Sequence, residues 1–223
     1  MSDHIRERIQ VFDRSQQYAV IERRLPHWAQ AGTICFINWR TWDSIPAPVL
    51  EKWLAERDAW LARHGIDPHR ADWNARLELL DKRLVAEFRE FIADRWNGHL
   101  DECRGSCVLQ RPGLSKIVSD SLLHFDGERY DLTDFVVMPN HVHILCAFPD
   151  ESAMLAQCES WKYFTATKIN RALGRRGRFW QQDGFDHLVR SPDEFSHLRC
   201  YFADNPRFAH LQAGDFVHWS KQL

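Results

Sequence analysis

The sequence of 223 residues predicts an α+β fold: a ferredoxin-like antiparallel sheet with helices on one face, followed by a further C-terminal helix. Two observations support this prediction. Segments of β-branched and aromatic residues alternate with segments of helical periodicity, and their order is strand, helix, strand, strand, helix, strand, helix. A long helical stretch interrupts this order after the first strand. We therefore treat residues 1–223 as one domain with a helical insertion at about 49–105.

The first strand and the insertion precede the rest of the predicted sheet. The stretch "GTICFINWR" from Gly32 is rich in β-branched and aromatic residues and predicts a strand, which the prolines of "DSIPAP" end. From about residue 49, apolar residues recur at helical spacing as far as Gly65, and a second long helical pattern follows. This segment contains no motif with an evident chemistry, so we interpret it as a helical insertion or a partner surface.

Turn residues and periodicity predict the remaining elements. These are a helix at about 115–125, strands at 130–139 and 141–148, a helix at 151–174 and a strand at 184–190. The break at Pro139 is short enough for its two flanking strands to form a hairpin. Ser191 as N-cap and Pro192 as first helical residue begin the last helix. We expect that helix to end near Asn205, because Pro206 disfavours helical backbone before it.

Composition restricts the class of protein. The formal net charge of -2 gives no overall basic excess, so a role with nucleic acid must rest on local patches. Of the six cysteines, only Cys103 and Cys107 are close in sequence, and no second pair completes a zinc site. The charged N-terminus does not resemble a signal peptide, and no apolar run reaches transmembrane length. We expect a reduced, cytoplasmic protein with free thiols and no membrane partner.

Two histidines stand inside an apolar run past the middle of the chain. Residues two apart on a strand face the same side, so His141 and His143 project together, while Val142 and Ile144 face the other way. Two neutral imidazoles on the open face of the sheet can share a divalent cation. The alternative is a pair of half-exposed histidines with no ligand. A histidine-triad nucleotide hydrolase would need a third histidine at Leu145, so that class lacks its nucleophile here.

Two stretches resemble one family of enzymes. The first, "VVMPNHVHIL", resembles the histidine–hydrophobic–histidine (HUH) motif of single-tyrosine transposases. Together with "TATKINRALGRRGRFWQQDGFDHLVRSPDEFSHLRCYFADNP", it resembles the REP-associated tyrosine transposases, which are relatives of insertion-sequence transposases. The likeness runs from about Leu122 to Phe208, with a weaker similarity in "GTICFINWR". The helical insertion and the residues after Phe208 lie outside it.

The resemblance implies a metal-dependent single-stranded DNA endonuclease and strand transferase that acts on REP-like DNA hairpins during transposition or recombination. In this family a tyrosine attacks the scissile phosphate, forms a 5′-phosphotyrosine intermediate and releases a 3′-OH. The implied metal is Mg²⁺ or Mn²⁺, which polarises the phosphate. Two alternatives stay open: a domesticated hairpin-DNA-binding protein without cleavage activity, and a metal-dependent phosphodiesterase for small nucleotides. A monomer and a homodimer are both compatible with the sequence.

By position in the family, the nucleophile is Tyr201 and the catalytic metal ligands are His141 and His143. Tyr201 and Asn205 share one helix face, beside an apolar stripe that can hold the helix on the body of the protein. This stripe consists of Phe195, Leu198 and Phe202. Asn205 can supply a third metal ligand or can simply cap the end of the helix. The rival tyrosine is Tyr163, in an aromatic cluster on the preceding helix, where we expect core packing.

A basic, aromatic segment near the end of the helix at 151–174 is a candidate DNA surface. Arginines neutralise phosphates, and aromatic rings stack on unpaired bases. The candidate contacts are Lys168, Arg171, Arg175, Arg176, Arg178 and Trp180. The alternative role of the cations is a favourable interaction with the helix dipole. His187 in "FDHLVR" can line the cleft, contact DNA or orient a ligand, or it can be a satisfied histidine at a sheet edge. His197, one turn before Tyr201, is a candidate base.

Overall fold

The computed structural model describes residues 10–13, 15–16, 19–21, 27–70, 72–101, 103–181 and 185–222. Its strands are β1 (Ala19–Ile21), β2 (His27–Ala29), β3 (Ile34–Arg40), β4 (Asp131–Val137), β5 (His141–Ala147), β6 (Phe185–Leu188) and β7 (Val217–Ser220). Its helices are α2 (Ala47–Arg63), α3 (Trp73–Glu78), α4 (Lys82–Asp101), the 3₁₀ helix η1 (Val108–Gln110), α5 (Pro112–Leu123), α6 (Glu151–Ala172) and α7 (Pro192–Phe208). Within the described ranges, every helix is too short or too polar to cross a lipid bilayer.

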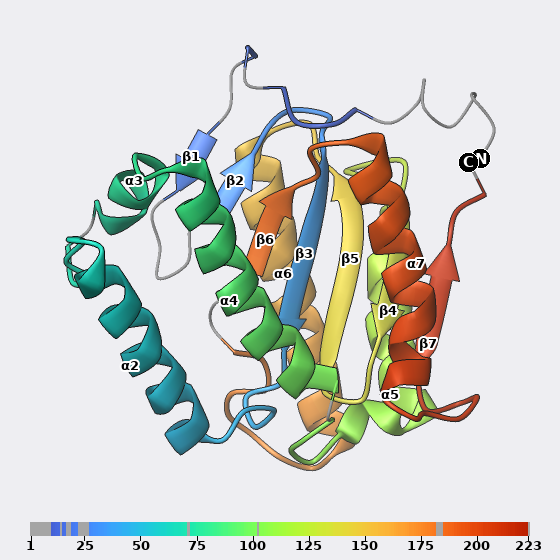
Figure 1. Ribbon diagram of the computed structural model, residues 1–223. Coiled ribbons are helices and arrows are strands. Elements are labelled where there is room, and N and C mark those ends of the chain that lie inside the picture. Colours follow the sequence, from blue (N-terminus) through green and yellow to red (C-terminus); the bar gives the residue numbers. More distant parts are fainter. Residues whose placement is uncertain are drawn as a thin grey trace.

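Five strands form one antiparallel sheet in the order β6-β3-β5-β4-β7 (Figure 1). The strands β3, β4, β5 and β6, with the helices α5 and α6, make the β-α-β-β-α-β arrangement of a ferredoxin-like sheet. The predicted fold class is therefore confirmed. The edge strand β7 pairs with β4, and it comes from a C-terminal region for which we predicted no element. The short strands β1 and β2 form a separate two-stranded sheet.

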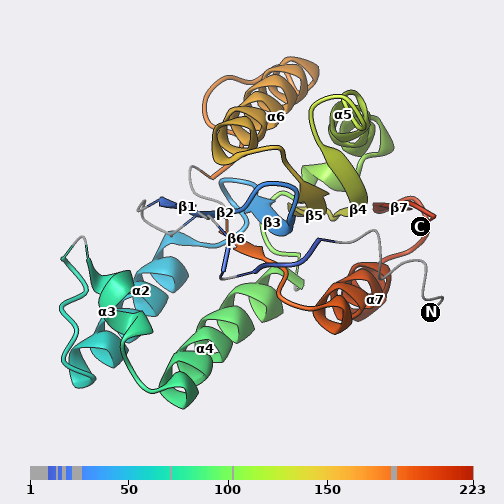
Figure 2. The same ribbon diagram turned by 90° about the horizontal axis from the view of Figure 1, so that it is seen from above.

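Helices cover both faces of the five-stranded sheet. The helices α5 and α6 lie on one face, and α4 and α7 lie on the other (Figure 2). The larger core lies under α5 and α6 and contains Leu122, Ile144 and Trp161. A smaller core lies under α7 and contains Leu145 and Phe202. The expectation of helices on one face holds for the ferredoxin-like unit, while α7 and the insertion add a second layer.

The helical insertion consists of α2, α3 and α4, between β3 and α5. It has an apolar cluster of its own, made of Trp60, Leu61, Ile66, Leu77 and Phe88. The helix α4 contacts α7, and both views show α4 nearer to the sheet than α2 (Figures 1 and 2). The last part of the insertion thus belongs to the layer over the sheet, and its first part extends away from that layer.

The last helix does not end where we expected. The helix α7 continues through Pro206, which lies inside it. A proline inside a helix removes the hydrogen bond to the carbonyl four residues earlier. The loss falls in the last turn, where the Ala209 N–H still bonds the Asn205 carbonyl (3.1 Å) and the Leu211 N–H bonds the Pro206 carbonyl (2.9 Å). Both Asn205 and Pro206 are buried, so packing holds this turn in place.

Candidate active site

The two histidines of β5 lie side by side on the sheet face that α7 covers. The ring centroids of His141 and His143 are 4.6 Å apart. In the register of the sheet, Arg40 of β3 pairs with His141, and Asn38 pairs with His143. Val142 belongs to the core on the opposite face, under α5 and α6. The alternation that we expected from the sequence is therefore confirmed.

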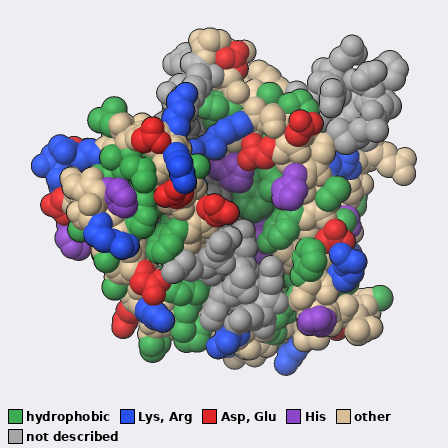
Figure 3. Space-filling view, in the orientation of Figure 1, with side chains coloured by type: hydrophobic (Ala, Val, Ile, Leu, Met, Phe, Trp, Pro, Cys, Tyr) green, Lys and Arg blue, Asp and Glu red, His purple; other side chains and the backbone are tan. Residues whose placement is uncertain are grey.

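This face of the sheet is not open, contrary to our expectation. Both histidines are fully buried, so the half exposure that the alternative assumed is wrong, whereas their role as ligands stays a prediction. Phe202 of α7 stacks on His143 at 5.6 Å between centroids, and Phe36 of β3 lies 5.5 Å from the same ring. Figure 3 shows a hollow on this side of the molecule with histidine side chains around it. The helix α7 therefore covers this side of the histidine pair.

Asn140 determines which nitrogen of His141 carries the proton. The Asn140 amide nitrogen donates to the Arg104 carbonyl (2.9 Å), which leaves its Oδ1 as an acceptor. That oxygen lies 2.7 Å from Nδ1 of His141, so Nδ1 is protonated and Nε2 keeps its lone pair. In the sequence, this position is identified only as part of a break between two strands. An amide next to a candidate ligand is the signal that could have identified it.

Burial keeps both imidazoles neutral. It lowers the pKa of His141 well below the usual 6.5, with a further decrease from the neighbouring His143, and it lowers the pKa of His143 to about 3. Among the described residues, no group makes a hydrogen bond to His141 Nε2 or to either nitrogen of His143. A buried polar atom without a partner costs about 1–3 kcal/mol. Two neutral imidazoles in this state are suited to bind a cation.

Helix α7 brings Tyr201 to the histidine pair. The Tyr201 ring lies 5.5 Å from the ring of His143, and its hydroxyl is shielded from solvent. The predicted apolar stripe is confirmed, because Phe195 and Phe202 are buried and Leu198 packs against the same core. The stripe holds α7 on the sheet with the tyrosine beside the histidines.

The other tyrosines lie elsewhere or cannot be placed. Tyr18 lies outside the described residues. Tyr130 is buried, its hydroxyl donates to the Leu122 carbonyl (2.8 Å), and burial raises its pKa to about 12. Tyr163 lies on α6, which covers the opposite face of the sheet, and it is 78% exposed. The core packing that we expected for Tyr163 is therefore wrong, and this rival of Tyr201 is not at the site.

Asn205 lies one turn after Tyr201 and is fully buried within α7. Because the helix continues past it, our alternative that Asn205 caps the helix end is wrong. Within the described ranges, no group of three or more His, Cys, Asp and Glu side chains could hold a metal ion. The histidine pair would therefore need an amide, water or phosphate oxygen to complete a metal site. The candidate base His197 is exposed on α7.

His187 of the edge strand β6 is linked to the start of α7. Its Nε2 lies 3.0 Å from Glu194 Oε1, and Glu194 Oε2 accepts the Arg190 N–H (2.7 Å). Burial would raise the pKa of Glu194, but the hydrogen bonds from His187 and Arg190 lower it overall. The Glu194 N–H donates to Ser191, the N-cap of α7 (3.0 Å). These bonds link the edge strand β6 to the start of α7, and the role of His187 stays a prediction.

The basic segment divides into buried rings and exposed cations. Phe179 and Trp180 are buried, and the Trp180 indole N–H donates to Thr165 (2.8 Å), so neither ring is free to stack on a base in this structure. The exposed cations are Lys168, Arg171, Arg175, Arg176 and Arg178. The Arg178 guanidinium lies over the exposed ring of Trp42, 4.4 Å from its centroid. Trp42 is a contact that the sequence pattern did not indicate.

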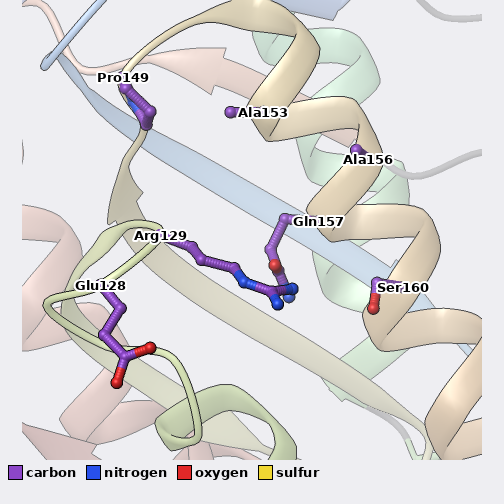
Figure 4. A pocket seen from close by; sticks show the side chains of 7 residues that line it. All are labelled: Glu128, Arg129, Pro149, Ala153, Ala156, Gln157 and Ser160. Atoms are coloured by element: carbon purple, nitrogen blue, oxygen red, sulfur yellow. The ribbon is translucent and has the colours of Figure 1, made fainter.

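A surface pocket at the far end of β5 has no comparable chemistry. It is lined by Glu128, Arg129, Pro149, Ala153, Ala156, Gln157 and Ser160. Figure 4 shows Arg129 reaching across this pocket toward Gln157. Pro149 follows the end of β5, whereas His141 begins it, so the pocket and the histidine pair lie at opposite ends of the strand.

Comparisons with known proteins give one distant structural similarity. No family model matches this sequence, and no curated protein matches it. The chain is similar to a solved structure described as "Structure of the REP associates tyrosine transposase bound to a REP hairpin". The two share 11% sequence identity with a TM-score of 0.43, over 81% of this chain and 70% of that chain.

Proposed function

We propose that this protein cleaves and rejoins single-stranded DNA beside a hairpin, with Tyr201 as the nucleophile and His141 and His143 as metal ligands. One observation carries the proposal. A tyrosine from α7 lies 5.5 Å, ring to ring, from His143, which forms a buried pair of neutral histidines with His141 on β5. The resemblance of the same residues to the REP-associated tyrosine transposases supports a DNA hairpin as the substrate.

Metal binding is the second part of the proposal. A cation would be bound by the lone pair of His141 Nε2 and by a lone pair of His143, which make no hydrogen bond within the described residues. Asn205 on α7 is the proposed third ligand. A bound Mg²⁺ or Mn²⁺ would supply Lewis-acid polarisation of the scissile phosphate. Asn140 would keep His141 in the tautomer that presents Nε2.

The protein's own side chains define the covalent step. The Tyr201 oxygen forms a bond to phosphorus, the bond from phosphorus to the 3′ oxygen breaks, and that oxygen leaves as a 3′-OH. The phenol loses its proton and the departing 3′ oxygen gains one, so the step is balanced. Because the Tyr201 hydroxyl is shielded from solvent, the DNA strand must enter between α7 and the sheet before attack. The exposed cations near the end of α6 would bind its phosphates.

A covalent adduct tests this proposal. The protein is incubated with Mn²⁺ and single-stranded oligonucleotides that copy palindromes flanking its gene, and products are separated under denaturing conditions. We expect a protein–DNA band from the wild type and none from Tyr201→Phe, because only the phenol oxygen can form the bond. Tyr163→Phe is the matched control and should retain the band. A wild type without an adduct, or a Tyr201→Phe variant that still forms it, contradicts the mechanism.

A second candidate is a hairpin-DNA-binding protein that does not cut. The complete burial of both histidines and the shielding of the Tyr201 hydroxyl favour it, since a working nuclease must expose these groups to its substrate. This candidate predicts hairpin binding that is equal in the wild type and in Tyr201→Phe, with no adduct from either protein. The same set of reactions therefore separates the two functions.

A further inference from the structure

Trp42 presents a large aromatic ring to solvent from a rigid position. The side chain is 49% exposed. Its backbone N–H donates to the Phe179 carbonyl (2.8 Å), and its carbonyl accepts from Nε2 of Gln181 (2.8 Å). The N–H of Gln181 in turn donates to the Arg40 carbonyl (2.9 Å). A fixed backbone under an exposed indole is the arrangement of a preorganised stacking surface.

This ring lies at the end of the sheet where the histidine pair begins. Arg40, the last residue of β3, pairs with His141. The next residue, Thr41, donates its N–H to the Asn140 carbonyl (2.8 Å), and the Asn140 side chain binds His141. Trp42 therefore follows directly on the segment that pairs with Asn140 and His141.

The charges around Trp42 favour a phosphate backbone. The Arg178 guanidinium lies over the indole at 4.4 Å, and the Arg175 guanidinium lies 5.2 Å from the ring of the neighbouring Phe179. Arg176, between them in sequence, is also exposed. The neighbouring carboxylate of Asp43 accepts the Ser106 N–H (2.9 Å). Proteins that bind single-stranded nucleic acids combine cationic side chains with exposed aromatic rings in this way.

We infer that Trp42 and Arg178 form a binding site for one unpaired nucleotide of the DNA strand next to its hairpin. The base stacks on the Trp42 indole, and Arg178 contacts the adjoining phosphate. The identity of the strand as DNA rests on the proposed function, whereas the stacking site rests on its own geometry. Because every base has an aromatic face, the site takes any base.

Binding to two DNA probes tests this inference without cleavage. Both probes are fluorescein-labelled: one is a hairpin with an unpaired tail, and the other is the same hairpin with a blunt end. Anisotropy titrations are run in EDTA, in the Tyr201→Phe background. We expect Trp42→Ala to weaken binding of the tailed hairpin about tenfold and to leave the blunt hairpin unchanged. Trp42→Phe should retain most of the affinity, because phenylalanine still stacks.

Two controls make the result specific. Tyr163→Ala removes another exposed aromatic ring, on α6, and should not change binding of either probe. A thermal unfolding midpoint equal to that of the parent protein shows that Trp42→Ala is folded.

Single abasic positions in the tail locate the base that stacks on Trp42. One abasic position should weaken binding to the parent protein about tenfold and have no further effect on binding to Trp42→Ala.

Three results would overturn the inference. They are equal binding of the tailed hairpin by Trp42→Ala and the parent protein, equal losses on both probes, and a Trp42→Phe variant as weak as Trp42→Ala. Failure of the proposed function has a different outcome, since an absent covalent adduct leaves the effect of Trp42 on the tailed probe intact.

Discussion

The two faces of β5 are equally buried and chemically opposite. On the face under α5 and α6, Val142 and Ile144 meet an apolar core. On the face under α7, His141 and His143 are just as inaccessible, and ring nitrogens of both lack hydrogen-bond partners in the described part of the chain. The apolar face stabilises the fold, whereas the buried histidines on the other face lower the free energy of unfolding. Buried polar groups without partners therefore distinguish the candidate site from the apolar core, which burial alone does not.

Substitutions on the two faces should have opposite effects, and the largest belongs to the apolar face. We expect Ile144→Ala to lower the free energy of unfolding by about 3 kcal/mol, because it leaves a cavity in the larger core. His143→Leu should leave that free energy unchanged or raise it by about 1 kcal/mol, because it removes a buried imidazole without partners. Urea unfolding at pH 7 in EDTA measures both. Equal losses from the two substitutions would show that the two faces contribute equally to the free energy of unfolding.

A buried ion pair holds α7 on the sheet and gives the next largest effect. Arg199, two residues before Tyr201, donates through Nε to the buried carboxylate of Asp134 on β4 (2.9 Å). Ser220 of β7 donates to the same oxygen (2.6 Å), and Arg199 also donates to Ser220 and to the Lys221 carbonyl. Burial raises the pKa of Asp134 even though these bonds lower it. Ser220 and Arg199 therefore both stabilise the buried carboxylate, and Arg199 is its cation.

We expect Arg199→Ala to cost about 2–3 kcal/mol in the free energy of unfolding, because it leaves the Asp134 charge buried without its cation. The expected loss is smaller than for a fully buried pair, because the Arg199 side chain is partly exposed. Adding Asp134→Leu should recover most of the loss, as an apolar residue needs no partner. Urea unfolding of the two single variants and the double variant measures the coupling. If the double variant is no more stable than Arg199→Ala, the loss does not come from an unpaired charge on Asp134.

Much of the fold could be predicted because it follows local periodicity. The two-residue alternation around His141 and the helical stripe of Phe195, Leu198 and Phe202 each depend on neighbours in sequence. The same stripe predicted that Tyr201 would be held on the body of the protein. These predictions needed no knowledge of long-range contacts.

The rest depends on residues distant in sequence. The tautomer of His141 follows only once the Arg104 carbonyl, 36 residues away in sequence, accepts from the amide nitrogen of Asn140. His143 is covered by Phe202 and Tyr201 of α7 and by Phe36 of β3, and the strand β7 is set by pairing with β4. Pro206 was a strong local signal, but tertiary packing in the last turn outweighed it. Local pattern thus predicted elements and faces, while closure of the site required the assembled structure.

Acid should weaken the protein through the histidine face. The folded state keeps His143 neutral to about pH 3, whereas the unfolded chain takes up its proton near pH 6.5. Stability is therefore full above pH 6.5 and falls as the pH decreases toward 3, by about 1.4 kcal/mol per pH unit for this residue. We expect His143→Leu to lose that much less per unit between pH 6 and pH 4. Urea unfolding in EDTA at these pH values measures the difference, and parallel slopes would contradict it.

The smallest expected effect is that of a metal on stability, and it separates a ligand site from a merely tolerated histidine pair. A cation that binds only the folded protein raises the free energy of unfolding by about 1.4 kcal/mol at roughly ten times its dissociation constant. We expect Mn²⁺ to do so in the wild type and in Tyr201→Phe, where both histidines remain. It should have no effect in His143→Leu, and EDTA should reverse it. Equal stabilisation of His143→Leu would place the cation elsewhere, and the cost of the buried imidazoles would then need another explanation.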